Sequence, residues 1–260
     1  MPRFAANLSM MFTEWSFLDR FAAAADAGFA AVEYLFPYDH EPDEVGRALA
    51  RAGLSQALFN LPPGNWAAGE RGMAAFPARS EELAAAVESA LPYARATDCR
   101  TLHLMAGIAD RADERAASAY RTAVARTAER LADAGITLVL EPINMRDMPG
   151  YFLNDFGYAA ALIGELGLPN LALQFDIYHR QILHGDVVMG LREMMPIIGH
   201  VQIAGVPDRH EPDTGELSFL YVTEELDRLG YDGFIGCEYR PRAGTLEGLG
   251  WFAPYRAEAR

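Results

Sequence analysis

The sequence predicts one (β/α)₈ barrel, the TIM-barrel fold, as a single domain over residues 1–260. Short hydrophobic runs alternate with longer amphipathic stretches, which is the pattern of a parallel sheet covered by helices. Eight such units fit into 260 residues, a length at which this barrel forms one domain. Polar residues also follow several of the hydrophobic runs, and in this fold the carboxyl ends of the strands carry the active site.

Eight runs are predicted as strands because they are short and rich in apolar, β-branched or aromatic residues. They cover residues 3–7, 31–35, 55–60, 101–105, 136–141, 171–176, 200–203 and 233–238. An open doubly wound sheet is the alternative arrangement of such units. That fold usually has a glycine-rich phosphate-binding turn after an early strand, and the sequence contains none, so the closed barrel is favoured.

Five stretches with a helical spacing of apolar residues are predicted as helices. They cover residues 14–27, 81–96, 112–134, 155–166 and 220–229. Glycines stand just before the predicted strands, where a left-handed residue commonly ends a helix. These glycines are Gly28, Gly53, Gly135, Gly167 and Gly230.

Two connections are longer than is usual for this fold. Residues 61–79 follow the third strand and are rich in glycine, proline and aromatic residues, so we expect them to cover the mouth of the barrel as a lid. Residues 204–215 follow the seventh strand and bring Arg209 and His210 near the same mouth.

The composition excludes several classes of partner. The formal net charge is −14 and the basic residues are scattered, which argues against nucleic acid and against an anionic membrane surface. Cys99 and Cys237 form neither a CxxC motif nor a disulfide framework, which favours a reducing compartment. Residues 1–7 lack a signal-peptide pattern and no apolar run reaches transmembrane length, so we expect a cytoplasmic protein. A homo-oligomer is compatible with the sequence, which does not set the number of subunits.

Four predicted strands end on a side chain with an oxygen donor: Glu141, Asp176, Gln202 and Glu238. These residues are 35, 26 and 36 positions apart, about one strand-and-helix unit each. An unpaired carboxylate at the end of a buried strand is unfavourable, so four oxygen donors at matching positions indicate one shared site. Three carboxylates and an amide suit a hard divalent cation, and we expect Mg²⁺ or Mn²⁺.

Glu141 and Glu238 follow the fifth and eighth strands, which are three apart in a closed ring of eight. Their carboxylates can therefore face each other across the mouth of the barrel, with a small chelating substrate between them. We interpret them as an acid and base pair for proton transfer at carbon, with the cation stabilising an enediolate. Taken singly, each of the four oxygen donors is also compatible with a solvated strand end.

Three candidate substrate-binding residues lie near these strand ends. His179 follows Asp176 by three positions and either donates to a substrate oxygen or is a structural loop residue. Arg209 has a planar guanidinium that suits a substrate carboxylate, unless it lies on the surface. His103 has an inward position in a strand, where it borders the pocket or packs in the core.

Three further candidates lie on loops. Asp147 follows Glu141 by six positions and either holds a substrate hydroxyl or caps its own loop. Glu70 and Arg71 lie in the long loop after the third strand. They either contact the substrate, with Arg71 as a second partner for its carboxylate, or form an exposed ion pair with each other.

Eight motifs, taken together and in order, resemble the hydroxypyruvate isomerase family, whose barrel superfamily also contains ketose 3-epimerases and endonuclease IV. The motifs are NLSMMF (7–12), EYLFPY (33–38), NLPPGNWAAGERG (60–72), EPIN (141–144), DIYH (176–179), HVQIA (200–204), RHEPDTGE (209–216) and GCEY (236–239). The resemblance covers about residues 2–255. It implies a barrel that interconverts hydroxypyruvate and 2-hydroxy-3-oxopropanoate (tartronate semialdehyde), with Glu141 and Glu238 as the catalytic residues.

The resemblance also implies a metal site. The metal ligands of the related epimerases correspond to Glu141, Asp176, Gln202 and Glu238, but the epimerases have a histidine where this chain has Gln202. The amide oxygen still suits Mg²⁺ or Mn²⁺, and we expect the exchange to make the metal labile. The epimerases also have a glutamate at the position of Asp147, so the shorter side chain implies a different, smaller substrate.

Other activities remain as alternatives. The 2-oxo-tetronate isomerases share most of these motifs and act on a four-carbon acid, whereas the NWAAG (65–69) and EPIN (141–144) segments favour the three-carbon substrate. A DNA repair nuclease of the superfamily would need more metal-binding histidines and a basic groove, and this chain has 6 histidines and a charge of −14. The paired glutamates argue against a protein that binds a sugar acid without catalysis.

Overall fold

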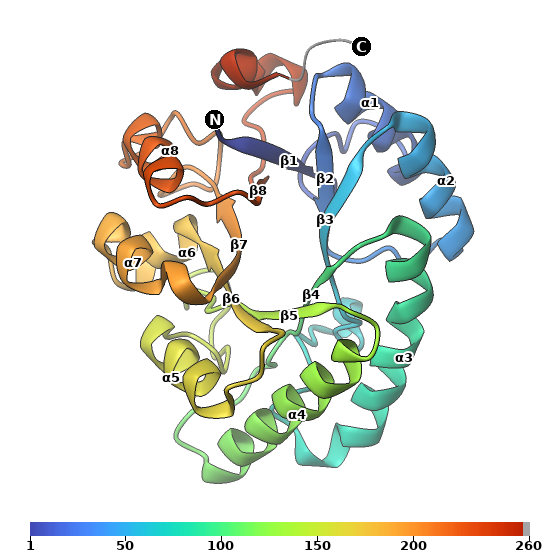
Figure 1. Ribbon diagram of the computed structural model, residues 1–260, viewed down its shortest axis with the longest axis vertical. Coiled ribbons are helices and arrows are strands. Elements are labelled where there is room, and N and C mark those ends of the chain that lie inside the picture. Colours follow the sequence, from blue (N-terminus) through green and yellow to red (C-terminus); the bar gives the residue numbers. More distant parts are fainter. Residues whose placement is uncertain (257–260) are drawn as a thin grey trace.

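The barrel is closed by eight parallel strands in chain order, with β8 pairing with β1 (Figure 1). This computed structural model describes residues 1–256. The strands are β1 Arg3–Asn7, β2 Ala31–Tyr34, β3 Ser55–Asn60, β4 Thr101–His103, β5 Thr137–Leu140, β6 Leu171–Asp176, β7 Ile198–Ile203 and β8 Phe234–Cys237. The predicted barrel is therefore confirmed, and closure excludes the open doubly wound sheet.

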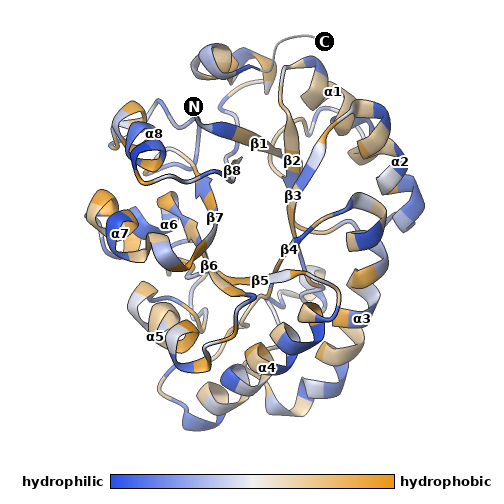
Figure 2. Ribbon diagram, in the orientation of Figure 1, coloured by the Kyte–Doolittle hydropathy of each residue, from blue (hydrophilic) through white to orange (hydrophobic). Residues whose placement is uncertain are grey.

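Helices surround the strands on the outside of the barrel (Figure 1). The α-helices are α1 Arg20–Asp26, α2 Pro42–Ala52, α3 Ser80–Thr97, α4 Glu114–Ala132, α5 Phe156–Leu166, α6 Ile177–Leu183, α7 Val187–Met194 and α8 Phe219–Arg228. Short 3₁₀ helices are η1 Phe17–Asp19, η2 Trp66–Ala68, η3 Pro77–Arg79, η4 Met195–Ile197 and η5 Leu246–Tyr255. Figure 2 shows that strand β5 is largely hydrophobic, whereas a helix such as α4 carries both hydrophobic and hydrophilic residues. No helix within residues 1–256 is long and apolar enough to cross a membrane.

The helices differ from the prediction in two respects. The predicted helix at 14–27 begins later, because Glu14 uses its carboxylate to accept hydrogen bonds from the backbone N–H and hydroxyl of Thr245, which keeps its segment out of the helix. The structure also contains α6 and α7, which were not predicted, and α2, of which only the end at Gly53 was predicted. α6 starts directly after β6, with the Asp176 carboxylate accepting from the backbone N–H of Tyr178, so no separate helix signal precedes it.

The loop after β3 joins the barrel through the end of β4. Gly72 forms an antiparallel bridge with Ala106, and a Cβ at Gly72 would lie 2.2 Å from the backbone oxygen of Met105. With φ at +115°, only glycine allows this close approach without strain. This pairing anchors the loop beside the end of β4. Strand β4 itself ends at His103, two residues before the predicted end.

Strand register places polar residues of neighbouring strands at matching heights. Asp176 of β6 is opposite Gln202 of β7, and Gln202 is opposite Gly236 of β8. Asn7 of β1 is likewise opposite Glu33 of β2. The polar side chains of the barrel interior thus gather at the carboxyl ends of the strands, where the site lies.

Candidate active site

A cavity of about 280 Å³ opens at the carboxyl ends of the strands. Its lining includes most of the predicted site residues: His103, Glu141, Asp147, His179, Gln202, Arg209, Glu238 and Arg71. Asp176 lies beneath this lining, fully buried. Glu70 is outside the lining.

The four predicted strand-end residues come together in the fold. Glu141 and Glu238 directly follow β5 and β8, while Asp176 and Gln202 belong to β6 and β7. Each is at most 7% exposed. Oxygen atoms of this kind are rarely buried so densely without a partner or a ligand, so the arrangement identifies a polar centre inside the barrel.

Arg209 is the positive charge at the middle of this centre. Its Nη2 lies 3.1 Å from Oε1 of Glu238, 3.4 Å from Oδ2 of Asp176 and 3.5 Å from Nε2 of His179. Its Nη1 lies 3.4 Å from Oδ2 of Asp147, and its guanidinium stands over the ring of Tyr178, 4.8 Å from the centroid. The guanidinium therefore contacts three carboxylates at once, and its single charge offsets part of their repulsion.

The loop after β7 aims Arg209 inward. Arg209 has a φ of +58°, a left-handed conformation that costs a residue with a Cβ roughly 1–2 kcal/mol. Two backbone hydrogen bonds hold it there: its N–H donates to the oxygen of Gly205, and the N–H of Arg240 donates to its oxygen. The buried side chain lines the cavity, which excludes a surface position for Arg209.

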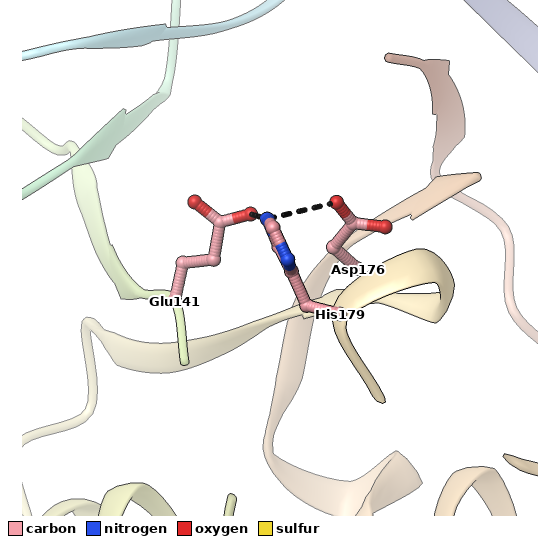
Figure 3. Close-up of side chains that lie close together, drawn as sticks. All are labelled: Glu141, Asp176 and His179. Atoms are coloured by element: carbon pink, nitrogen blue, oxygen red, sulfur yellow. Dashed lines mark ion pairs between the residues drawn. The ribbon is translucent and has the colours of Figure 1, made fainter. Parts of the chain in front are cut away.

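His179 lies on the first turn of α6, not on a loop, and faces Asp176 and Glu141 (Figure 3). Its Nε2 is 3.5 Å from Asp176 and 3.8 Å from Glu141. The backbone N–H of Asn144 donates to Nδ1 at 3.3 Å, so the proton of the neutral ring sits on Nε2. His179 is thus oriented as a hydrogen-bond donor toward the space between the two carboxylates.

A second polar cluster lies deeper in the barrel and centres on Glu33, which the sequence analysis did not single out. Its carboxylate accepts from the Asn7 amide at 2.9 Å, from the Gln202 amide at 2.8 Å and pairs with Nε2 of His200 at 2.7 Å. A Cβ at Gly236 would lie 2.1 Å from this carboxylate, so β8 needs a glycine there. A charged residue inside the predicted strand 31–35 was the sequence signal for it.

The same cluster fixes the amide of Gln202. Its nitrogen donates to Glu33, while its oxygen accepts from the Gln174 amide at 2.6 Å. Gln174, also missed from the sequence, borders the cavity with an Oε1 that has no partner among residues 1–256. Both the nitrogen and the oxygen of the Gln202 amide therefore already form hydrogen bonds.

Burial and crowding raise the pKa values of the acidic residues. Burial, followed by repulsion from Glu238 and Asp176, raises the pKa of Glu141 well above its usual range. Burial raises the pKa of Glu238 to about 8 and that of Asp176 to about 6, although Arg209 opposes both shifts. Carboxyls whose pKa values are moved toward neutrality suit proton transfer at neutral pH.

The two buried histidines of the site are neutral. Burial, with a contribution from His200, lowers the pKa of His103 to about 3. Burial lowers the pKa of His179 well below its usual range, and Arg209 adds to the effect. Both rings therefore present one N–H donor and one lone pair each.

The long loop after β3 contributes one wall of the cavity mouth. The guanidinium of Arg71 stacks on Trp66 at 3.8 Å from the ring centroid, and both residues line the cavity. Glu70 points elsewhere: its carboxylate binds Arg79 at 2.9 Å and accepts from the N–H of Asn65. Glu70 thus braces the loop, and the alternative of an ion pair between Glu70 and Arg71 is wrong.

Asp147 both organises its loop and faces the cavity. Its carboxylate accepts from the Asn144 amide at 3.3 Å, from the Tyr178 hydroxyl at 3.3 Å and from Arg209. It also lines the cavity. In this position Asp147 can therefore cap its own loop and also face a substrate hydroxyl.

The donor set fits a divalent cation only loosely. One atom each from Glu141, Asp176 and His179 lie within 4.8 Å of one another, which is close enough to share an ion. However, Nε2 of His179 carries its proton, and the oxygen of Gln202 already accepts a hydrogen bond. Arg209 also contacts Oδ2 of Asp176, the oxygen that faces His179. The carboxylates fit a cation, and the competing positive charge favours weak binding.

Comparison with known proteins places this geometry in context. Residues 21–255 match the model of the xylose isomerase-like TIM barrel family. The chain is 56% identical to a 2-oxo-tetronate isomerase of Cupriavidus necator, over 98% of this chain and 99% of that protein. It is 42% identical to the hydroxypyruvate isomerase of Escherichia coli, over 98% of this chain and 100% of that protein.

Among solved structures, the fold is similar to one described as an AP endonuclease of family 2 from Brucella melitensis. The two chains share 51% identity with a TM-score of 0.96, over 98% of this chain and 100% of the other.

Proposed function

Because the chain belongs to the xylose isomerase-like TIM barrel family, we propose that it interconverts hydroxypyruvate and 2-hydroxy-3-oxopropanoate. The observation that carries this proposal is the pair of buried carboxyls, Glu141 and Glu238, that border one small cavity with raised pKa values. Full-length relatives named as hydroxypyruvate isomerase support the same reaction. The partner is thus a small 2-oxo acid.

The reaction is a proton transfer between adjacent carbons. One glutamate in its ionised form removes a proton from carbon 3 of hydroxypyruvate, and the C–H electron pair forms the carbon–carbon double bond of an enediolate. The other glutamate, in its protonated form, delivers a proton to carbon 2, while the hydroxyl proton passes from oxygen 3 to oxygen 2. Mutual repulsion and burial make it unfavourable for Glu141 and Glu238 to ionise together, which keeps one as acid and one as base.

Cationic side chains orient the substrate. Arg209 balances the carboxylates around it and, with the Nε2–H of His179, faces the substrate's oxygens. Within residues 1–256, Arg71 forms no ion pair and stands at the mouth, which makes it the stronger partner for the substrate carboxylate. The reacting carbons then point inward toward the two glutamates. From the sequence, Arg209 was expected to be the main partner of the substrate carboxylate and Arg71 a second one. The proposal gives the carboxylate to Arg71 and the other substrate oxygens to Arg209.

We propose that a divalent cation, Mg²⁺ or Mn²⁺, binds weakly at Glu141 and Asp176, with Gln202 and Glu238 as further candidates. When bound, such a cation would polarise the substrate carbonyl. Activity measured with EDTA and with added Mg²⁺ or Mn²⁺ tests this point. We expect EDTA to lower the activity and either cation to restore it. Turnover that is insensitive to EDTA would contradict the proposed metal site.

The second candidate substrate is the four-carbon acid 2-oxo-tetronate. The 56% identity to the isomerase of that name from Cupriavidus necator favours it. A coupled assay that compares kcat/KM for hydroxypyruvate and 2-oxo-tetronate separates the two. A preference for the four-carbon acid would replace hydroxypyruvate in the proposal and leave the isomerase chemistry intact.

Nucleolytic activity is not our proposal, although one similar structure is described as an AP endonuclease. The net charge of −14 opposes binding to a phosphate backbone. A gel-shift experiment with duplex DNA that contains an abasic site is expected to show no complex. Cytoplasmic residence is the matching proposal for location, supported by the two free, buried cysteines Cys99 and Cys237.

The direct test of the mechanism replaces each glutamate singly. Glu141→Gln and Glu238→Gln keep size and shape but remove the titrating group, so each should lose at least about a hundredfold in kcat with an unchanged circular dichroism spectrum. Glu165→Gln, at an exposed glutamate of α5, is the matched control and should retain full activity. Turnover near the unmodified level in either active-site variant would overturn the assignment.

A further inference from the structure

His103 is buried in the barrel without satisfying its ring. The side chain is 1% exposed, yet neither Nδ1 nor Nε2 has a hydrogen-bond partner among residues 1–256. The carboxylate of Glu141 lies 3.8 Å from Nδ1, too far for a hydrogen bond. Buried polar groups in proteins are nearly always paired, so two open ring nitrogens require an explanation.

The position of the His103 ring explains why its two nitrogens are unpaired. His103 ends β4, opposite Asn60 of β3, and borders the same cavity as Glu141 and Gln174. Glu141 and Gln174 each also have an Oε1 without a partner among the described residues. Donors and acceptors left open on one cavity wall match a ligand that carries both a carbonyl oxygen and a hydroxyl.

The ring is suited to donate a hydrogen bond without giving up a proton. Burial and the nearby His200 keep it neutral, so it offers one N–H and one lone pair. A neutral imidazole can stabilise charge that develops on an oxygen without protonating it. A core role alone would favour an apolar side chain at this position, because packing leaves both nitrogens unsatisfied.

We propose that His103 is a catalytic residue whose N–H donates to oxygen 2 of the substrate, a role that rests on the proposed isomerase function. As a glutamate removes the proton from carbon 3, the C–H pair becomes the C2–C3 double bond and the carbonyl pair moves onto oxygen 2. The His103 N–H stabilises the negative charge that develops there and keeps its proton throughout. No additional reactant is required.

The first test is His103→Leu, which removes the donor and keeps the site apolar. We expect kcat to fall by about 10²–10³-fold with a much smaller change in KM, because the bond strengthens only as charge develops. Tyr120→Phe is the matched control, since Tyr120 also has a buried hydroxyl with no partner among the described residues but lies on α4, outside the cavity. It should keep full activity, and kcat of His103→Leu within threefold of the unmodified enzyme would overturn the proposal.

A binding experiment on the unmodified protein covers the case in which His103→Leu fails to fold. The ligand is the hydroxamate analogue of hydroxypyruvate, in which the CH₂OH group is replaced by NHOH so that it resembles the enediolate. We expect its binding to shift the ring ¹⁵N resonances of His103, with D-glycerate giving a smaller shift. Unchanged His103 resonances in a protein that isomerises its substrate would reject the role of His103 alone. A protein that neither turns over the 2-oxo acids nor binds the analogue would reject the isomerase function as well.

Discussion

Arg209 determines how much negative charge the cavity can hold. It contacts Asp147, Asp176 and Glu238, and its opposing effect on the pKa values of Asp176 and Glu238 limits how far burial raises them. Loss of this guanidinium would raise the pKa values of Asp176 and Glu238 further. One guanidinium therefore maintains a site in which acid and base forms coexist.

The raised pKa of Glu238 makes stability depend on pH. Its pKa is about 8 in the folded protein and about 4.5 in an ordinary setting, so the unfolded chain releases this proton first. Its contribution is fully present below about pH 4.5 and is lost as pH rises through 8. We expect Glu238→Gln to abolish this loss, whose upper limit for a shift from 4.5 to about 8 is roughly 5 kcal/mol.

Urea unfolding of both proteins at about pH 5 and about pH 8.5 measures this contribution. For each protein, the quantity to compare is the change in the free energy of unfolding between the two pH values. Taking this difference removes part of the effect of the contact with Arg209 that Glu238→Gln loses. Parallel stability curves for the two proteins would contradict the raised pKa.

Individual site residues were only partly predictable from the sequence. The strand-end residues Glu141, Asp176, Gln202 and Glu238 were found because strand ends in a barrel face one mouth. Glu33 and Gln174 were missed because they lie inside strands, where side-chain direction depends on register. The engagement of Gln202 by Gln174 was equally invisible, since it depends on the pairing of β6 with β7.

The loop after β3 lines the mouth of the cavity, so the proposed function assigns it to substrate binding rather than to proton transfer. Arg71 and Trp66 form part of the cavity wall, while Glu70 and Arg79 brace the loop from outside. The loop thus forms one wall of the cavity mouth, and its action as a lid stays a prediction. Its sequence signalled the length and aromatic content but not the separate roles of Glu70 and Arg71.

Arg71→Ala should therefore impair binding more than turnover. A charged hydrogen bond to a carboxylate contributes about 1.5–3 kcal/mol, so we expect KM to rise roughly tenfold or more with kcat within a fewfold. Arg47→Ala on α2, outside this cavity, is the matched control. Initial rates over a range of hydroxypyruvate concentrations separate the two constants, and an unchanged KM would return the carboxylate to Arg209.

Helix packing makes a different prediction at two glycines. A Cβ at Gly46 of α2 would lie 2.6 Å from the backbone oxygen of Ala96 in α3, whereas one at Gly164 of α5 would meet nothing within 4 Å. Gly46→Ala should lower the free energy of unfolding by about 1–3 kcal/mol. Gly164→Ala should raise it by about 0.5–1 kcal/mol, because alanine favours the helix. Thermal melting of the pair checks the sign, and equal shifts would contradict the close contact of α2 with α3.

Closure of the barrel was predictable because it depends on the repeat of strand and helix, which is visible along the whole chain. Its helices were less so. α6 and α7 have 7 and 8 residues, too short to reveal a period, and their positions follow from packing onto the finished barrel. Local patterns thus define the eight strands, while tertiary contacts select the shorter helices.

The net charge of −14 acts on the whole molecule. Self-repulsion among surface carboxylates opposes the compact state, and salt screens it within a Debye length of about 10 Å at 0.1 M ionic strength. We expect the melting temperature at neutral pH to rise between low and moderate NaCl. The rise should vanish near the isoelectric point of about 4.8, and a rise of equal size there would point to a cause other than charge.

The bridge between Gly72 and Ala106 anchors the β3 loop to the backbone after β4, while Glu141 and Glu238 directly follow β5 and β8. Under the proposed function, the loop residues that contact the substrate are thus anchored separately from the glutamates that transfer its proton. We accordingly expect that replacing residues 61–79 with the corresponding loop of a 2-oxo-tetronate isomerase would change the preference between three-carbon and four-carbon substrates. The rate of proton transfer should stay the same.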